Sequence, residues 1–399
     1  MAVYRTFPDD QDELFYEYMQ YGFSPEDGPA EYDAADRRYP VGDRRGLYRS
    51  HERAEDPLSV CRHYWLDATV RGSVHPIVGL TSVITPPEHR RDGYVTELLG
   101  EVLREYRERD RHFTVLWPFD YGFYRSFGWE TVSNKRVYSG DLDALAFAAA
   151  EAPPGRYRRL STDDFASVEP VYDAFSAEYS FTLVRDAEWW RTRVCRARDT
   201  EPFVYVWERE GDPEAYLVYT FEDDADGRTL SVREVGYTGV DGLLAALAFC
   251  YNHDSQAERF ELTVPDDTVV QDLLTRPNEL DCALHTRPMA RLVDVTAALE
   301  GMRYPLVDES VTVAVADDLA PWNDDTFELS VVDGDGTCQP TDEPSAVELD
   351  VATLTQLVTG YRTAGELARA DRIEATDPTA VRALDRLFPA TTTFFNDGF

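Results

Sequence analysis

The stretch 80–99 restricts the possible folds of this 399-residue chain more than any other. It begins with the strand-like residues 80–84, turns at two prolines, and continues through residues 90–93 (Arg-Arg-Asp-Gly) into the amphipathic pattern of residues 96–109. A strand that leads directly into a helix is typical of a mixed α+β protein. The amino end of such a helix offers unpaired N–H groups and a positive dipole end to a phosphate. An ordinary strand–helix connection with surface arginines is the alternative interpretation.

The order of strands and helices divides the chain into three sections. We expect domains at residues 1–150, 151–290 and 291–399, with a Pro-Pro-Gly linker after the first. The strand at 229–236 and the helix at 241–252 repeat the order found at 78–84 and 96–109. This repetition predicts an internal duplication of one α+β unit, followed by a third domain of different composition.

The charge of the chain excludes several classes of partner. The formal net charge is −36, from 39 basic and 75 acidic residues, and Lys135 is the single lysine. A surface this acidic repels phosphate backbones and anionic lipid, so the sequence predicts neither nucleic-acid nor membrane binding. Dispersed carboxylates are screened in molar salt, and we therefore interpret the charge as adaptation to a salty cytoplasm. An acidic surface made for cationic partners is the alternative.

Other features predict a cytoplasmic protein without a metal. The polar, acidic amino terminus does not resemble a signal peptide, and the apolar runs are too short to span a bilayer. The five cysteines form no CxxC pair, as in a reducing compartment. The seven histidines show neither HxH nor HExxH spacing, so we expect no metal site.

Two motifs resemble those of the GNAT acetyltransferases. Arg90-Arg91-Asp92-Gly93-Tyr94-Val95 is similar to the coenzyme A loop of that family, although Val95 stands where a small residue is usual. The later segment 120–130 (Asp-Tyr-Gly-Phe-Tyr-Arg-Ser-Phe-Gly-Trp-Glu) resembles the ending of a GNAT unit. The second section has no equivalent basic loop, so we expect it not to bind acetyl-CoA.

The resemblance to one branch of that family covers essentially the whole chain. The two motifs, residues 188–193 (Glu-Trp-Trp-Arg-Thr-Arg), residues 291–295 (Arg-Leu-Val-Asp-Val) and the terminal phenylalanine together resemble the Eis family. The resemblance implies two tandem GNAT units followed by a sterol-carrier-protein-like domain. It also implies a homo-hexamer, in which the carboxy terminus of the third domain enters the active site.

The resemblance assigns expected roles residue by residue. The pantetheine arm of acetyl-CoA would bind the backbone of Val83, Ile84 and Thr85. The pyrophosphate loop would consist of Arg91, Asp92, Gly93, Tyr94, Val95 and Thr96. Phe119 and Asp120 would lie near the thioester, although Phe119 replaces the small polar residue usual in the family.

Two further residues are expected to carry the chemistry. The resemblance makes Tyr124 the proton donor to the departing thiolate, and it makes the α-carboxylate of Phe399 the proton acceptor. A tyrosine near pKa ~10 is protonated at working pH, and burial beside Phe394 and Phe395 would raise the pKa of an α-carboxyl from ~3.5. A core role for Tyr124, with Tyr121 as a rival, and a hydrophobic peg at Phe399 are the alternatives.

Together these observations predict direct transfer of an acetyl group from acetyl-CoA to a small cationic amine. A free alkyl amine has a pKa near ~10.4, so a base must remove a proton before attack. The resemblance implies aminoglycosides, polyamines or lysine-like side chains as acceptors. The alternative is a carrier of lipids or other hydrophobic molecules, which uses the third domain and keeps the GNAT units as a scaffold.

Overall fold

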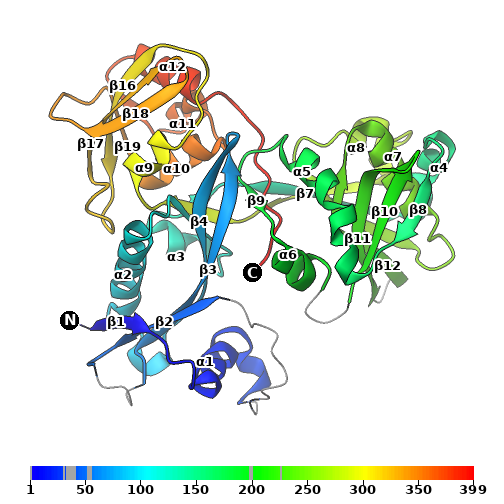
Figure 1. Cartoon of the computed structure of the whole chain (residues 1–399), viewed down its shortest axis with the longest axis horizontal. Coiled ribbons are helices and arrows are strands. Elements are labelled where there is room, and N and C mark those ends of the chain that lie inside the picture. Colours follow the sequence, from blue (N-terminus) through cyan, green and yellow to red (C-terminus); the bar gives the residue numbers. More distant parts are fainter. Residues whose placement is uncertain (1, 30–31, 33–41, 52–55, 197–200, 225–226) are drawn as a thin grey trace. The chain divides into compact units, whose positions relative to one another are not determined.

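A computed structural model describes residues 2–29, 32, 42–51, 56–196, 201–224 and 227–399 (Figure 1). The chain forms two compact units, which we call unit 1 and unit 2. Unit 1 comprises Met1–Val132, Pro288–Ala390 and Phe399, and unit 2 comprises Ser133–Arg287 and Thr391–Gly398. Both units combine helices with sheets, so the predicted α+β class is confirmed. None of the described helices is long and apolar enough to cross a bilayer.

The first sheet of unit 1 is built around two long antiparallel strands. In spatial order it contains β1 (Val3–Thr6), β2 (Asp43–Tyr48), β3 (Ser59–Val70), β4 (Ser73–Ile84), β5 (Phe113–Leu116), β15 (Met289–Leu292) and β6 (Glu130–Thr131). The helices that accompany it are α1 (Asp12–Phe23), α2 (Tyr94–Glu108) and α3 (Tyr121–Arg125).

Helix α2 packs on this sheet through one apolar face. Leu98, Leu99, Val102, Leu103 and Tyr106 are fully buried. Their spacing matches the 3.6-residue period of an amphipathic helix, and acidic and basic residues occupy the outer face. The helix expected at residues 96–109 is therefore confirmed, with a start two residues earlier.

Unit 1 also contains a smaller sheet with its own helices. Its strands, in spatial order, are β18 (Asp335–Pro340), β17 (Asp325–Val332), β16 (Glu309–Ala316), β19 (Val347–Asp350) and β20 (Glu374–Ala375). Its helices are α9 (Val295–Glu300), α10 (Val351–Thr359), α11 (Ala364–Arg369) and α12 (Pro378–Leu387). Between β17 and β18, Asp333 and Gly334 both have positive φ, at 53° and 88°. These two residues form a two-residue hairpin turn, in which positive φ at both central positions is usual.

Unit 2 is a single twisted sheet covered by helices. In spatial order its strands are β14 (Asp281–Thr286), β7 (Asn134–Asp141), β13 (Arg259–Pro265), β12 (Gly227–Tyr237), β11 (Asp212–Asp224), β10 (Phe203–Arg209) and β8 (Arg156–Arg159). The other elements are α4 (Ala146–Glu151), α5 (Glu169–Ser176), β9 (Thr182–Val184), α6 (Ala187–Trp189), α7 (Val240–Tyr251) and α8 (Val270–Leu273). Helix α7 is buried from Gly242 to Cys250 and forms the centre of the core.

Two strands lie in sheets that their chain position does not suggest. We expected β7 to belong with residues 1–150, but it pairs with β13 and β14 in unit 2. Strand β15 follows the first segment of unit 2, Ser133–Arg287, in the sequence and pairs with β5 and β6 in unit 1. A hydrophobic pattern shows that a segment is a strand but not which sheet it joins. The domain boundaries 1–150, 151–290 and 291–399 stay a prediction.

The motifs that gave the family resemblance contact each other inside unit 1. Gly128 has φ of 84°, and a Cβ there would collide with the guanidinium of Arg291. That guanidinium donates to the Phe127 carbonyl at 2.5 Å and to both carboxylate oxygens of Asp317 at 2.6 and 2.5 Å. The glycine and the arginine thus form one buried joint between the sheet and the segment that follows β16.

Candidate active site in unit 1

Strand β4 separates from β5 part-way along its length. The described pairing joins Ile77–Gly79 to Phe113–Val115 in parallel, whereas β4 continues to Ile84. Within the described part of the chain, the β5-facing edge of residues 80–84 has no strand partner. An open strand edge can pair with an extended ligand that carries amide groups.

A β-bulge interrupts the regular pairing of β4 within this open segment. The register of β4 against β3 shifts between Thr81 and Ile84, and Ser82 has φ of 54°. Val83 then packs toward the cluster under α2. The Ile84 carbonyl accepts a hydrogen bond from Ser59 Oγ at 3.1 Å, and Ser59 Oγ lies 2.9 Å from Thr85 Oγ1. Some polar groups of the expected arm-binding residues therefore have partners inside the protein.

The loop between β4 and α2 is exposed and carries two arginines. Arg90 donates to the Thr85 carbonyl at 3.0 Å and lies over the ring of Tyr21, so it ties the loop to the strand. Arg91 is exposed and has φ of 68°. Gly93, with φ of 84°, precedes the helix, and a Cβ there would meet no atom within 4 Å.

The first turn of α2 is therefore open to solvent. Asp92 and Thr96 are exposed, and Tyr94 and Val95 are half-buried. Together, the six residues 91–96 expected in the pyrophosphate loop form one continuous turn at the amino end of a 15-residue helix. Free N–H groups, the helix dipole and a nearby arginine all favour an anion at this position.

Tyr124 is held in the short helix α3, directly after β5. Its ring contacts those of Phe119, Phe123 and Trp129, with centroids 5.7, 5.1 and 6.2 Å away. The side chain is 5% exposed, and burial raises the pKa of its hydroxyl. The phenol is therefore a neutral hydrogen-bond donor at neutral pH. Tyr121, the rival, is half-buried and lies against Arg125.

Asp120 and Phe119, the two residues expected near the thioester, make different contacts in the structure. The Asp120 carboxylate accepts the Phe123 N–H at 2.7 Å and caps α3. This contact fixes the helix that carries Tyr124. Phe119 is 74% exposed, which is unusual for a phenylalanine, although its ring touches those of Phe123 and Tyr124.

The terminal residue lies at the point where the strands diverge. The ring of Phe399 is 5.5 Å from that of Tyr64, and a Cβ on Gly79 would lie 2.9 Å from it. Gly79 forms the last described pair between β4 and β5 and also faces Tyr64 on β3. Val78 and Leu80 belong to the cluster under α2, so Phe399 occupies the opposite face of the sheet.

The residues before Phe399 are held by backbone contacts in unit 2. Thr393 forms a β-bridge with Ser180, and the Ser180 N–H donates to the Thr392 carbonyl at 2.8 Å. The Phe395 N–H donates to Ser133 Oγ at 3.0 Å. The tail is thus a fixed, extended segment of unit 2 up to Asp397, which sequence inspection did not predict.

A buried ion-pair network anchors the end of this segment. Asp397 accepts hydrogen bonds at 2.8 Å from both Arg185 and the Trp189 indole. Arg185 also binds both oxygens of Glu234, at 2.7 and 2.9 Å. Burial raises the pKa of Asp397, and Arg185 opposes that shift. Arg185 and Asp397 are 212 positions apart, so no sequence spacing could have paired them.

A second group of catalytic residue types lies in the core of unit 1. Cys61 Sγ is 3.2 Å from His63 Nε2, and His63 Nδ1 is 3.8 Å from Glu105. Burial raises the pKa of the Cys61 thiol and lowers the pKa of His63 to about 3. Both side chains are fully enclosed. A neutral thiol without access to solvent cannot act as an acyl carrier, so this group is structural.

The described residues contain no group of three or more His, Cys, Asp or Glu placed to hold a metal ion. Trp189 and Trp190, which belong to the segment 188–193 of the family resemblance, are both buried.

Comparisons with known proteins find similarity along most of the chain. Acetyltransferase (GNAT) domain models match residues 3–132 and 182–292, and a sterol carrier protein domain model matches residues 295–396. The Mycobacterium tuberculosis protein named N-acetyltransferase Eis is 27% identical over 336 residues, which cover 81% of each chain. A Streptomyces griseus protein named as an uncharacterized N-acetyltransferase is 27% identical over 340 residues, which cover 80% of each chain.

Solved structures share the fold over the whole length. A probable N-acyltransferase from Enterococcus faecalis superposes with a TM-score of 0.89 at 21% identity, and both chains are covered completely. Eis1 from Mycobacterium abscessus superposes with a TM-score of 0.77 at 23% identity, again over both complete chains. The predicted order of two GNAT domains and a sterol-carrier-like domain is confirmed.

Proposed function

We propose that this chain is an acetyl-CoA-dependent acetyltransferase of the Eis type, and that it moves the acetyl group directly to a primary amine of a small cationic acceptor. The observation that carries the proposal is the convergence of an open strand edge, a basic helix start and a buried tyrosine around one gap between β4 and β5. The carrier alternative is not favoured, because the relatives are named as N-acetyltransferases.

Acetyl-CoA fits the open side of β4. We assign the pantetheine amides to the backbone of Val83, Ile84 and Thr85, because an extended chain with alternating donors and acceptors complements a strand edge. We assign the pyrophosphate to the turn from Arg91 to Thr96, which presents backbone N–H groups and one exposed arginine. Phe119 and Asp120 follow β5 and would border the thioester end.

The acceptor nitrogen must be neutral when it attacks. In the proposed reaction its lone pair attacks the thioester carbonyl, and the bond between carbon and sulfur breaks. The Phe399 carboxylate takes the proton that the nitrogen loses, and Tyr124 gives its phenolic proton to the thiolate. Burial raises the pKa of Tyr124 and so keeps its phenol protonated at working pH, which means that a proton is present when the thiolate leaves.

The excess of carboxylates supports a cationic acceptor. At a net charge of −36 the protein attracts polyamines, aminoglycosides and lysine-rich peptides, with an attraction that falls as salt increases. We further infer from the resemblance a homo-hexamer that works in the salty cytoplasm of a halophile. Light scattering in molar KCl tests the assembly state.

The first test is thiol release from acetyl-CoA in molar KCl, with a panel of polyamines, aminoglycosides and lysine peptides. We expect at least one amine to release thiol at a rate that saturates with both substrates, and mass spectrometry to find one added acetyl group. Failure of acetyl-CoA to bind, measured by calorimetry, would contradict the proposal. Binding without turnover of any amine would contradict the assigned acceptor class.

A further inference from the structure

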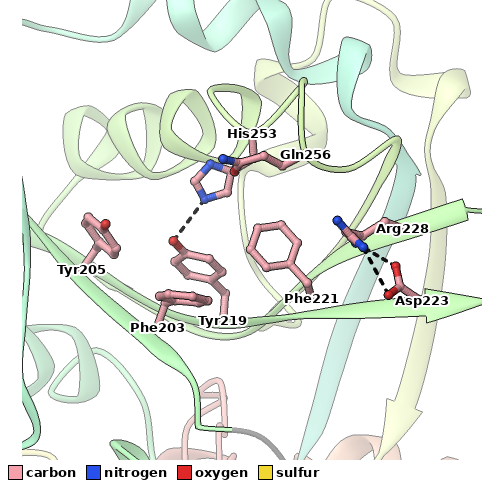
Figure 2. Close-up of a pocket in the computed structure, with 8 residues that line it drawn as sticks. All are labelled: Phe203, Tyr205, Tyr219, Phe221, Asp223, Arg228, His253 and Gln256. Carbon is pink, nitrogen blue, oxygen red and sulfur yellow. Dashed lines mark hydrogen bonds and ion pairs between the residues drawn. The ribbon is translucent and has the colours of Figure 1, made fainter.

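Unit 2 contains an open cavity of about 480 Å³ that none of the proposed chemistry uses (Figure 2). Its walls come from β10, β11, the start of β12 and the segment that follows α7. The junction of unit 2 that corresponds to the cofactor loop lies at the other end of β12, at Tyr237–Val240. The cavity is therefore not a remnant of an acetyl-CoA site. Its volume lies within the range of small-molecule sites.

One end of the cavity is a wall of neutral aromatic rings. Phe203 and Tyr219 are stacked, with centroids 5.4 Å apart and planes at 23°. The Tyr219 hydroxyl and His253 Nε2 are 3.1 Å apart, and the His253 ring lies 5.6 Å from that of Phe221. Burial lowers the pKa of His253, so it is neutral near pH 7. These contacts fix the wall in place before any ligand arrives, which lowers the entropic cost of binding.

The other end of the cavity is acidic. An adjoining hollow of about 410 Å³ shares Asp223 and Arg228 with the first and adds Asp254 and Glu258. Arg228 is paired with Asp223 at 2.7 Å, as the dashed lines in Figure 2 show. The carboxylates of Asp254 and Glu258 therefore outweigh the cations at this end. Two other arginines lie nearby: Arg159 is at the far end over the ring of Phe203, and Arg259, which follows Glu258 in the sequence, is paired with Asp141 at 3.5 Å.

We propose that this cavity binds a small organic cation that carries an aromatic or other planar apolar group. The apolar group would pack against Tyr219, Phe221 and His253, where ring faces and edges give shape-specific contact. The cationic group would lie near Asp254 and Glu258, within reach of the ring of Phe221. This binding goes beyond acetyl transfer, because none of the residues assigned to the reaction lines the cavity.

The test uses the full-length chain and benzyltrimethylammonium as the probe. A quaternary ammonium has no N–H and cannot accept an acetyl group, so its binding reports on a site other than the acceptor site. We expect calorimetry in low salt to give one site per chain with Kd on the order of 1 mM, the range for a ligand of this size. Phenylacetate, which has the ring but the opposite charge, and tetramethylammonium, which lacks the ring, should each bind at least ~10-fold more weakly.

Variants separate the two ends of the cavity. Phe221→Ala should weaken probe binding about fivefold to tenfold, and Asp254→Asn about threefold with a smaller salt dependence. Asp254 is exposed, so its variant keeps the fold even if Phe221→Ala does not. Asp212→Asn removes an exposed carboxylate from the first residue of β11 and should leave binding unchanged. Tyr124→Phe should also leave it unchanged, which separates this proposal from the proposed reaction.

Three results would overturn the proposal. The first is equal affinity for phenylacetate and the probe, and the second is unchanged probe affinity in both cavity variants. The third is a lower oligomer mass for Phe221→Ala together with no probe binding to the wild type, which would make this face an interface between copies of the chain.

Discussion

Units 1 and 2 contain the same strand-to-helix junction with different chemistry. In both units, the strand before the helix continues beyond its described pairing with a parallel neighbour. In unit 1, β4 pairs with β5 only up to Gly79, and in unit 2 the described pairing of β12 with β13 stops at Val232. In both, the strand carries a register shift and the helix is preceded by a glycine with positive φ, Gly93 at 84° and Gly239 at 99°. The two junctions therefore share these features of backbone geometry.

The differences lie in the length and charge of the connection. Unit 1 uses residues 85–93 with two arginines, whereas unit 2 connects β12 to α7 through residues 238–239. The first turn of α7 carries Asp241, which pairs with Arg209 at 2.5 Å. A carboxylate there repels a phosphate. A Cβ on Gly242 would lie 2.6 Å from the Glu214 carbonyl, so this turn also packs tightly on β11.

The short helices after β5 and β13 differ in the same way. Helix α3 carries Tyr124, while α8 consists of Val-Gln-Asp-Leu and offers no phenol. In the described residues, unit 2 thus has the same junction without arginines before its helix α7 and without a tyrosine in its short helix α8.

The largest expected effect is on the proton donor. Tyr124→Phe should lower kcat by about 10²- to 10³-fold, the usual contribution of a general acid, with the Kd for acetyl-CoA changed less than about twofold. Tyr121→Phe is the matched control and should keep near-normal kcat. Residual activity cannot come from α8, because that helix has no phenol. An equal loss of kcat in the two variants would contradict the assignment of Tyr124 as the proton donor.

The second prediction compares two glycine-to-alanine substitutions at positive φ, one in which the new Cβ would collide with a side chain and one in which it would meet open space. Gly128→Ala should lower the free energy of unfolding by at least about 2 kcal/mol, because the new Cβ would meet the Arg291 guanidinium at a positive φ. Gly239→Ala has a similar φ and open space, so it should cost about 1 kcal/mol. Urea unfolding of both variants measures the difference. Equal costs would show that the joint with Arg291 contributes nothing.

The third prediction concerns pH. Burial lowers the pKa of His75 to about 4, and His75 Nδ1 lies 3.0 Å from His112 Nδ1. Between the unfolded pKa of about 6.5 and pH 4, the unfolded chain binds more protons than the folded one. The free energy of unfolding therefore falls as pH drops through this window, by about 2–3 kcal/mol for His75. His253 in unit 2 is half-buried and should contribute less.

His75→Gln isolates this contribution. Unfolding of the variant should depend less steeply on pH between 6.5 and 4 than unfolding of the wild type. An unchanged slope would show that His75 is not buried in its neutral form.

The smallest effect is on acetyl-CoA affinity. Arg91→Glu gives unit 1 the charge found in unit 2 and should raise the Kd for acetyl-CoA about fivefold to tenfold. Asp241→Arg reverses the charge in unit 2 but leaves the short connection, so calorimetry should still find one acetyl-CoA per chain. A second site in that variant would mean that charge alone separates the units.

Local structure was predictable from sequence, and long-range pairing was not. The helix at residues 96–109 was predicted because apolar spacing is a local property. The placement of β7 and β15 in unexpected sheets, and the pairing of Arg185 with Asp397, depend on contacts between distant residues. Sequence inspection also missed the capping role of Asp120, which competes with its assigned place beside the thioester.

The most direct test of the central claim is to extend the chain past Phe399 by a few residues. The added peptide removes the free α-carboxylate of Phe399, the residue whose ring lies against Gly79, while leaving the loop at Arg91 and Gly93 intact. We predict a loss of kcat of at least 10²-fold with an unchanged Kd for acetyl-CoA. Cleavage of the extension back to Phe399 should restore the rate. An extended chain that turns over at the native rate would contradict the role of the terminal carboxylate.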